Sequence, residues 1–199
     1  MSLFDSDTIL QTPDTLKSTR ILKRESKREF ISAMKKEKVE AFLTTLPKNN
    51  ESYHIVSNGT FDFYTFIPIV VELMKSCNSF YGSTWTMNRN NVLDMLQLFD
   101  QKKIKTLNVI TGLYFKQRES SVYAQLVEGI LARNQRYICL ENHAKITLFE
   151  NGTDYITIEG SANFTSNPRI EQYVMTNSKE LFNFHKNWMD EILINAKGK

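Results

Sequence analysis

The chain has 199 residues, of which 41% are hydrophobic and 24% charged, and its formal net charge is only +3. This length is typical of one domain, or of one domain with an appendage, and it sustains a hydrophobic core without disulfides or a structural metal. The beginning of the chain lacks the apolar region of a signal peptide, and the longest apolar run, "FIPIVVELM", is too short to span a bilayer. Cys77 and Cys139 have no metal-binding or redox spacing. We therefore expect a cytoplasmic protein with reduced cysteines and no membrane contact.

Positive charge is concentrated near the N-terminus. Residues 17–38 hold nine Lys or Arg and three Glu, a net charge of +6, so the remaining residues together carry −3. Apolar residues at helical spacing over 15–46, without Gly or Pro, predict a basic helix that ends where "LPKNNES" begins. We therefore divide the chain into a basic helical extension, residues 1–47, and a main domain, residues 48–199. The helix either follows a nucleic-acid backbone or is a solvated or protein-binding face.

From residue 48 onward, strand-like and helix-like segments alternate along the chain. The expected strands cover residues 52–59, 78–87, 104–112, 136–143, 144–149, 154–160 and 170–177. The expected helices cover residues 61–76, 88–103, 119–134 and 179–196. This alternation predicts an α/β fold with a mixed, largely parallel sheet flanked by helices, to which a late hairpin adds antiparallel pairs.

That late hairpin brings together side chains that can carry out chemistry. Alternation along a strand places His143 and Lys145 on one face. The Asn-Gly pair at 151–152 is a strong turn signal, so the returning strand brings Ser161 and Asn163 back beside them. An imidazole, an ammonium, a hydroxyl and an amide thus meet at one end of the sheet, where open α/β sheets usually bind their ligands.

These groups suit a phosphodiester substrate. Lys145 supplies a positive charge for a phosphate, and Ser161 and Asn163 add neutral hydrogen-bond donors. His143 can act as a nucleophile or as a general acid. Glu171, on the following strand, can accept a hydrogen bond from the imidazole and orient it. No His, Cys or Asp cluster with metal-ligand spacing lies nearby, so the chemistry needs neither a metal nor another cofactor.

The order of these residues resembles the signature of a known family. The H-x-K at 143–145, the G-S-x-N at 160–163 and the later Glu171 are similar to the HKD motif of the phospholipase D superfamily. The run "GSANFTSNPRIEQYV" is similar to the nuclease branch of that superfamily, and the resemblance covers about residues 48–199. It implies a phospholipase D-like fold and a metal-independent phosphodiesterase, foremost a nuclease acting on DNA. In this family the histidine attacks phosphorus and forms a phosphohistidine.

The resemblance also implies a partner. Enzymes of the superfamily use two such motifs, whereas this chain has a single H-x-K, so the expected enzyme is a homodimer with one composite site. His143 of one subunit is expected to attack phosphorus, and His143 of the partner subunit to protonate the leaving oxygen. Lys145 and Asn163 are expected to hold the phosphoryl oxygens, with assistance from Ser161.

Two features depart from the family pattern and keep other interpretations open. The family has Asp five residues after the Lys, in a mainly structural role, whereas this chain has Glu150 there and Asp154 as its nearest Asp. The gap before Gly160 is also longer than usual, although the predicted turn can absorb it. One alternative is therefore a catalytically degenerate module that binds nucleic acid or supports assembly. Another is a phospholipase or transphosphatidylase, which should carry an apolar lid or interfacial helix.

Other segments have two interpretations each. Residues 84–88 either line the cleft or form a turn with an Asn cap, and residues 114–118 form either a basic rim or a solvated loop. His54 and His185 have no partners at useful spacing and are interpreted as structural.

Overall fold

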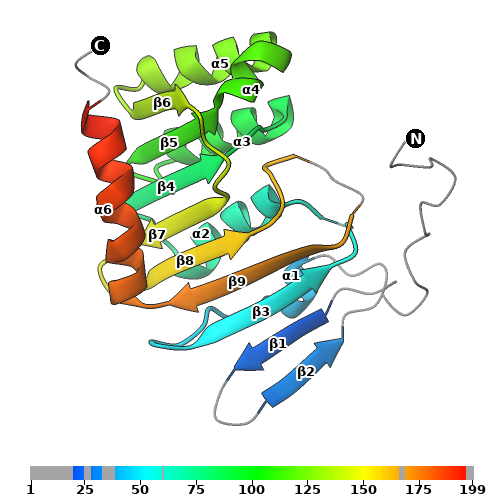
Figure 1. Cartoon of the computed structure of the whole chain (residues 1–199). Helices are drawn as coiled ribbons and strands as arrows, with labels where there is room; N and C mark the ends of the chain where they lie inside the picture. The colour runs from blue at the N-terminus through cyan, green and yellow to red at the C-terminus, as the bar shows by residue number, and fades with distance from the viewer. Residues whose placement is uncertain (1–19, 25–27, 33–38, 60, 166–168, 196–199) are drawn as a thin grey trace, which may run out of the picture.

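The computed structural model describes residues 20–24, 28–32, 39–59, 61–165 and 169–195. Within these residues the chain forms a nine-stranded sheet in the order β2-β1-β3-β9-β8-β7-β4-β5-β6 (Figure 1). The strands are β1 (Arg20–Arg24), β2 (Arg28–Ser32), β3 (Ser52–Ser57), β4 (Ser79–Thr84), β5 (Leu107–Gly112), β6 (Arg136–Leu140), β7 (Ile146–Glu150), β8 (Tyr155–Gly160) and β9 (Glu171–Asn177). The α-helices are α1 (Val39–Phe42), α2 (Phe66–Met74), α3 (Arg89–Asp100), α4 (Leu113–Arg118), α5 (Ser120–Leu131) and α6 (Lys179–Asn195). The predicted mixed α/β fold is thus confirmed for the described main domain.

The balance of strand directions differs from the prediction of a largely parallel sheet, which is wrong. Of the described strand pairs, only β4–β5 and β5–β6 are parallel. Helices α3 and α5 lie in the connections between these strands, and a crossover of that length is what parallel pairing requires. Strands β7, β8 and β9 follow one another without a helix between them, so they pair antiparallel.

More helices cover one face of the sheet than the other. Figure 1 shows α2, α3 and α5 behind the sheet and α6 alone in front of it. Successive residues of a strand point to opposite faces. Phe80 and Phe149 accordingly belong to the larger core under the several helices, whereas Leu148 packs with Met189 of α6 in a smaller one. Among the described helices, none is long and apolar enough to cross a bilayer.

The predicted N-terminal helix is wrong where the structure can be compared with it. Residues 20–24 and 28–32 form the antiparallel strands β1 and β2, and β1 pairs with β3. Ile21, Phe30 and Ile31 favour strands at least as much as helices, and the unpaired edge of β3 offers hydrogen-bond partners that a helix lacks. Of the described residues in 15–46, only those of α1 are helical. Residues 1–19, 25–27 and 33–38 lie outside the described part, and the boundary at residue 47 stays a prediction.

The predicted β7–β8 hairpin and its tip are confirmed. The last paired residues are Glu150 and Tyr155, and the side chain of Asn151 accepts hydrogen bonds from the backbone of Thr153 (2.9 Å) and Asp154 (2.8 Å). Gly152 has a φ of 96°, which only glycine adopts without strain. The turn therefore accommodates the longer gap between the two halves of the motif.

Candidate active site

His143 and Lys145 lie in the segment that leads into β7. They precede the strand, which begins at Ile146, so strand alternation is not what brings them together. Their side chains nevertheless meet, because Nζ of Lys145 lies 3.0 Å from Nδ1 of His143 and 2.6 Å from the carbonyl oxygen of the same residue. His143 is exposed, whereas Lys145 keeps only 7% of its surface exposed. The imidazole is therefore open to solvent, whereas the ammonium that contacts it is buried.

Asn142 fixes this segment to the end of β4, a role that the sequence analysis did not identify. Its Nδ2 donates to Oγ of Ser83 and to the carbonyl oxygen of Thr84, both at 3.1 Å. Its Oδ1 accepts from the backbone N–H of Ala144 at 3.1 Å. The hydroxyl of Ser83 also donates to the carbonyl oxygen of Ala144 at 3.1 Å. These bonds hold the backbone on both sides of His143.

The returning strand arrives where the hairpin geometry predicts. The backbone N–H of Gly160 donates to the carbonyl oxygen of Lys145 at 3.1 Å. Ser161 exchanges backbone and side-chain hydrogen bonds with Gln172, each at 3.1 Å, and its hydroxyl donates to the buried carboxylate of Glu171. Three segments that are distant in sequence therefore place an ammonium, a hydroxyl and a carboxylate together.

Gly160 has a role in packing. A Cβ at this position would lie 2.6 Å from the ring of Tyr173, a separation that real Cβ atoms do not show. The glycine therefore permits close packing of β8 against β9.

Burial sets the charge properties of Lys145. Desolvation lowers the pKa of its ammonium below the ordinary value, and the negative charge of Glu171 opposes this shift. Both hydrogen-bond contacts of Lys145 go to His143. Lys145 occupies Nδ1 of His143, so orientation of the imidazole by Glu171, which requires Lys145 to move, stays a prediction.

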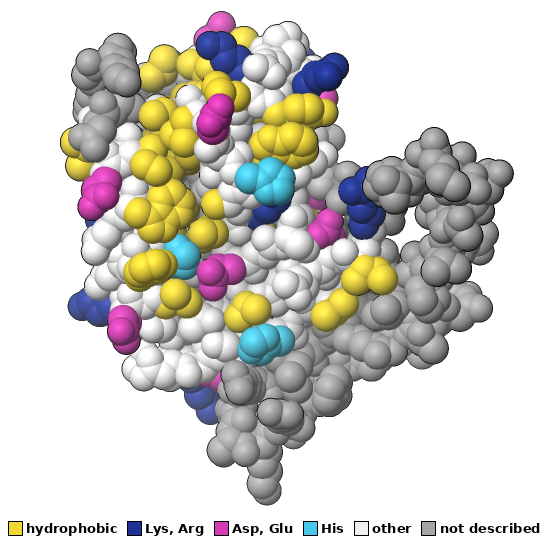
Figure 2. Space-filling model, in the orientation of Figure 1, with side chains coloured by type: hydrophobic (Ala, Val, Ile, Leu, Met, Phe, Trp, Pro, Cys, Tyr) yellow, Lys and Arg dark blue, Asp and Glu magenta, His cyan; other side chains and the backbone are white. Residues whose placement is uncertain are grey.

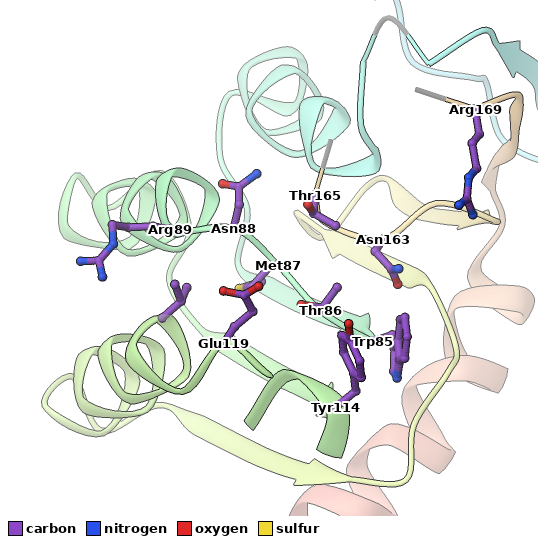
Figure 3. Close-up of a pocket in the computed structure, with 11 residues that line it drawn as sticks. Trp85, Thr86, Met87, Asn88, Arg89, Tyr114, Glu119, Asn163, Thr165 and Arg169 are labelled. Atoms are coloured by element: carbon purple, nitrogen blue, oxygen red, sulfur yellow. The ribbon is translucent and has the colours of Figure 1, made fainter. Parts of the chain in front are cut away.

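Asn163 lies in a neighbouring cavity of about 380 Å³. Figure 3 shows Asn163 and Trp85 facing this cavity, with Tyr114 against Trp85. Oδ1 of Asn163 is buried and has no hydrogen-bond partner among the described residues, which is unusual for a buried polar atom. The cavity is lined by Trp85, Thr86, Met87, Asn88, Arg89, Tyr114, Glu119, Val122, Asn163, Thr165 and Arg169.

Trp85 and Tyr114 connect the two parts of the site. Their rings stack with centroids 4.1 Å apart and planes at 23°, and the Trp85 ring lies 5.4 Å from that of His143. Gly112 makes room for this arrangement, because a Cβ there would lie 2.5 Å from Cδ1 of Trp85. A second, open hollow on the His143 side shares both aromatic residues. The two rings therefore form a wall between His143 and Asn163, called the aromatic wall below.

Trp85 and Tyr114 belong to two segments, 84–88 and 114–118, that each have two interpretations from the sequence. Residues 114–118 belong to α4 and are not a solvated loop, although Tyr114 itself is 38% exposed. Trp85 directly follows β4, and α4 directly follows β5. Because β4 and β5 are parallel neighbours, residues after their carboxyl ends meet at one edge of the sheet. The sequence alone does not show that β4 and β5 are neighbours, so it could not place Trp85 beside Tyr114.

Other reactive side chains in the described residues have structural surroundings. His185 is buried, accepts a hydrogen bond from Nε1 of Trp188 (3.1 Å) and lies 3.3 Å from Glu159. Burial raises the pKa of the Cys77 thiol to about 12, so it is not a nucleophile near neutral pH. No group of three His, Cys, Asp or Glu that could hold a metal ion occurs in the described part of the chain.

Comparison with known proteins gives a likeness of fold. No family model and no curated protein matches the sequence. A polyphosphate kinase from Porphyromonas gingivalis has a similar structure, with a TM-score of 0.51 at 13% identity; the match covers 72% of this chain but only 26% of that enzyme. A phospholipase D family member, Nuc from Salmonella typhimurium, aligns over 62% of this chain and 84% of its own, with a TM-score of 0.47 at 15% identity. Identities this low show a shared fold and no more.

Proposed function

We propose that the chain is a metal-independent phosphodiesterase of the phospholipase D type, a nuclease acting on DNA through a phosphohistidine at a composite homodimer site. The observation that carries this proposal is the contact between the buried ammonium of Lys145 and the exposed imidazole of His143, 3.0 Å apart. Ser161 and Glu171 are hydrogen-bonded to each other, and the charge of Glu171 acts on Lys145. The polyphosphate kinase of similar fold bears the name of an enzyme that acts on polyphosphate, which agrees with phosphorus chemistry on this fold.

The resting contact defines the first event of the proposed reaction. A charged ammonium only donates, so Nδ1 of His143 accepts from Lys145, and a neutral ring then keeps its proton on Nε2. A phosphodiester oxygen is a stronger acceptor for Lys145 and draws the ammonium away from the ring. The freed Nδ1 then takes up a proton from solvent while Nε2 releases its own proton to solvent. Nδ1–H donates a hydrogen bond to Glu171, and the Nε2 lone pair is free for attack.

The chemistry then proceeds in two balanced steps. Nε2 of His143 forms a bond to phosphorus while the phosphorus–oxygen ester bond breaks, and His143 of the partner subunit gives a proton to the leaving oxygen. Water next attacks the phosphohistidine, giving its proton to that partner imidazole, and the P–N bond breaks to release His143. Lys145 stabilises the charge on the non-bridging oxygens in both steps.

The composite site is supported by the sequence and by one face of the molecule. The chain has a single H-x-K. Hydrophobic side chains gather on the face that α6 covers, and histidine side chains are visible on the same side of the molecule (Figure 2). Phe184 on α6 is 65% exposed, and Ile138 and Leu140 of β6 are half-buried against the core beneath α6. A two-fold contact through this face would cover apolar surface and bring a second His143 towards the first.

DNA is proposed as the substrate because of charge. Arg89 and Arg169 are both exposed and line the cavity next to Asn163. The strongly basic segment 17–38 adds a net charge of +6. Contacts of this kind are made to phosphates and weaken steeply with salt.

The decisive experiment measures turnover with and without chelation. Purified protein and His143→Ala are incubated with plasmid and with bis(4-nitrophenyl) phosphate, in Mg²⁺ or in EDTA. Cleavage of both substrates that survives EDTA and is lost in His143→Ala is expected. His54→Ala is the matched control, because His54 lies on β3 outside the cluster, and it should keep full activity.

A binding module is the alternative, favoured by Glu150 in place of the family's Asp. It would show salt-sensitive DNA binding with no turnover of either substrate, and that result would replace the enzyme proposal.

The composite site has its own test. Sedimentation should give a dimer at micromolar concentration. Mixing wild type with excess His143→Ala should lower the activity per wild-type subunit, because each mixed dimer lacks one imidazole. An active monomer would contradict the composite site and leave the chemistry in place.

A further inference from the structure

The cavity beside Asn163 differs from a plain phosphate site. Besides Arg89 and Arg169, it is lined by the aromatic wall, by hydroxyl groups, by two amides and by the carboxylate of Glu119. Its volume of about 380 Å³ lies within the range of about 300–1,000 Å³ found for small-molecule sites. A lone phosphate needs neither the rings nor this volume.

The wall extends from the reacting imidazole into the cavity. Trp85 lies 5.4 Å from the His143 ring on one side, and on the other it stacks on Tyr114 at 4.1 Å. Tyr114 keeps 38% of its surface exposed, and the guanidinium of Arg118 stands 5.9 Å from its ring. Aromatic rings with a nearby cation are what proteins use to bind the bases of single-stranded nucleic acid.

The polar groups of the cavity provide the second observation. Oδ1 of Asn163 is buried and has no partner among the described residues, although its neighbours in the cavity include the hydroxyl-bearing Thr86 and Thr165. An unpaired buried acceptor is costly unless a ligand satisfies it. An amino group on the edge of a nucleobase is a donor of the required kind. An acyl chain would leave this acceptor unsatisfied, which argues against a lipid.

We propose, building on the nuclease function above, that this cavity takes an unpaired nucleobase of the substrate strand, packed on the aromatic wall with its polar edge at Asn163. The phosphate attached to that nucleotide then lies at His143, across the wall. In a duplex the base is stacked and paired, so it must be unstacked and unpaired before it can enter the cavity. The site therefore selects single-stranded over duplex nucleic acid.

The test measures binding without cleavage, so that it is independent of turnover. In the His143→Ala background, fluorescence anisotropy gives the Kd for three probes at one salt concentration. The probes are a labelled single-stranded oligonucleotide, the same strand with abasic positions, and its duplex. The strand with bases is expected to bind about 5- to 150-fold more tightly than the abasic strand, the range for one stacked base. The duplex is expected to bind more weakly than the single strand.

Variants of the aromatic wall test whether its rings cause the difference in Kd between the strand with bases and the abasic strand. Tyr114→Ala should remove the difference between the strand with bases and the abasic strand, whereas Tyr114→Phe should preserve it because the ring remains. Leu131→Ala is the matched control, since Leu131 is an exposed apolar residue at the end of α5 and lines none of the described hollows. Trp85 and Trp188 are the two tryptophans of the chain. Trp188→Phe therefore leaves Trp85 as an internal probe, whose fluorescence the strand with bases should quench more than the abasic strand.

Two results would overturn the inference. Equal Kd values for strands with and without bases would show that only phosphates are bound, and equal or tighter binding of the duplex would remove the strand preference. Either result leaves the nuclease proposal standing if wild-type protein cleaves bis(4-nitrophenyl) phosphate in EDTA. Loss of that turnover would instead remove the proposed function itself.

Discussion

Two polar clusters lie against the same sheet, and each joins a lysine, a carboxylate and a hydroxyl. The first, the α6 cluster, consists of Tyr81, Arg136, Lys186 and Asp190. Tyr81 donates to Asp190 at 2.9 Å, and Arg136 lies 2.8 Å from the same carboxylate oxygen. Lys186 donates to the second oxygen, and this hydrogen bond raises its pKa above the ordinary value. Each cation thus contacts the carboxylate directly, and the cluster fastens α6 to the sheet.

The second, the His143 cluster, consists of His143, Lys145, Ser161 and Glu171. Here the carboxylate of Glu171 bonds to Ser161, and both contacts of Lys145 are to His143. Desolvation lowers the pKa of Lys145, the opposite direction from Lys186. The comparison shows that similar groups serve different ends. In the α6 cluster the carboxylate raises the pKa of Lys186, whereas in the His143 cluster desolvation outweighs the charge of Glu171 and lowers the pKa of Lys145. In the proposed reaction a phosphate anion would offset that desolvation.

Exchanging each lysine for methionine is the strongest way to break this comparison. Lys145→Met should lower kcat by about 10²–10³-fold, the effect of removing one donor that stabilises transition-state charge. Lys186→Met should leave kcat unchanged, because its partner is Asp190. Turnover of bis(4-nitrophenyl) phosphate measures both variants. Equal losses in the two would mean that Lys145 acts only through stability.

The sequence predicted the elements of the main domain because hydrophobic period and turn residues are local signals. The Asn-Gly tip of the β7–β8 hairpin and the Asn88 cap of α3 follow from such signals, and the Asn88 side chain accepts from the backbone of Asn91 at 2.9 Å. Strand direction and the N-terminal strands are not local. Whether residues 20–24 form strand or helix depends on the free edge of β3, and no periodicity reports that edge.

The candidate site also has a part that local signals predict and a part that they do not. The hairpin alone predicts the meeting of Gly160 with Lys145, which their backbone bond confirms. Trp85 and Tyr114 meet only because β4 and β5 are neighbours. Gly82-Ser83 shows the limit of motif reading, since this dipeptide lies inside β4 with Ser83 buried and bonded to Ala144. The Gly-Ser dipeptide is packed inside the sheet in β4, whereas at the end of β8 it belongs to a polar cluster.

Asn142 sharpens the comparison by testing position without removing a charge. Asn142→Ala removes the bonds to Ser83, Thr84 and Ala144 that hold the backbone around His143. A displacement of about 1 Å in a reacting group costs up to about 10²-fold, so kcat should fall by about 10- to 100-fold. Because Asn142 acts through His143, the pH at which kcat is half-maximal should shift while KM changes little. A rise in KM alone would instead place Asn142 in substrate binding.

Asp190→Asn tests the structural role of the α6 cluster. Removing the carboxylate leaves Arg136 and Lys186 without their partner, so the free energy of unfolding should fall by about 1–3 kcal/mol, while kcat is retained. Burial opposes ionisation of Asp190, but hydrogen bonds from Lys186 and Tyr81 outweigh it and hold its pKa below 3.8. Its stabilisation is therefore present above that value and is lost as pH falls through the lowered pKa. Asp100 and Glu159 also have lowered pKa values, so urea unfolding from about pH 6 to about pH 2 should show a smaller acid loss in Asp190→Asn than in wild type.

The smallest expected effect is on stability at alkaline pH. There the two lysines should change the free energy of unfolding in opposite directions. The pKa of Lys145 is lowered in the folded protein, so between that value and 10.5 the unfolded chain binds more protons and stability rises with pH. The pKa of Lys186 is raised, so its stabilisation is complete below 10.5 and is lost as pH rises through the folded value. Other groups also titrate there, and only the difference from wild type isolates each lysine. Urea unfolding of Lys145→Met should lack the rise, and that of Lys186→Met should lack the fall. If both variants changed the alkaline slope in the same direction, the two clusters would be alike, and the distinction between a lysine with a lowered pKa and one with a raised pKa would fail.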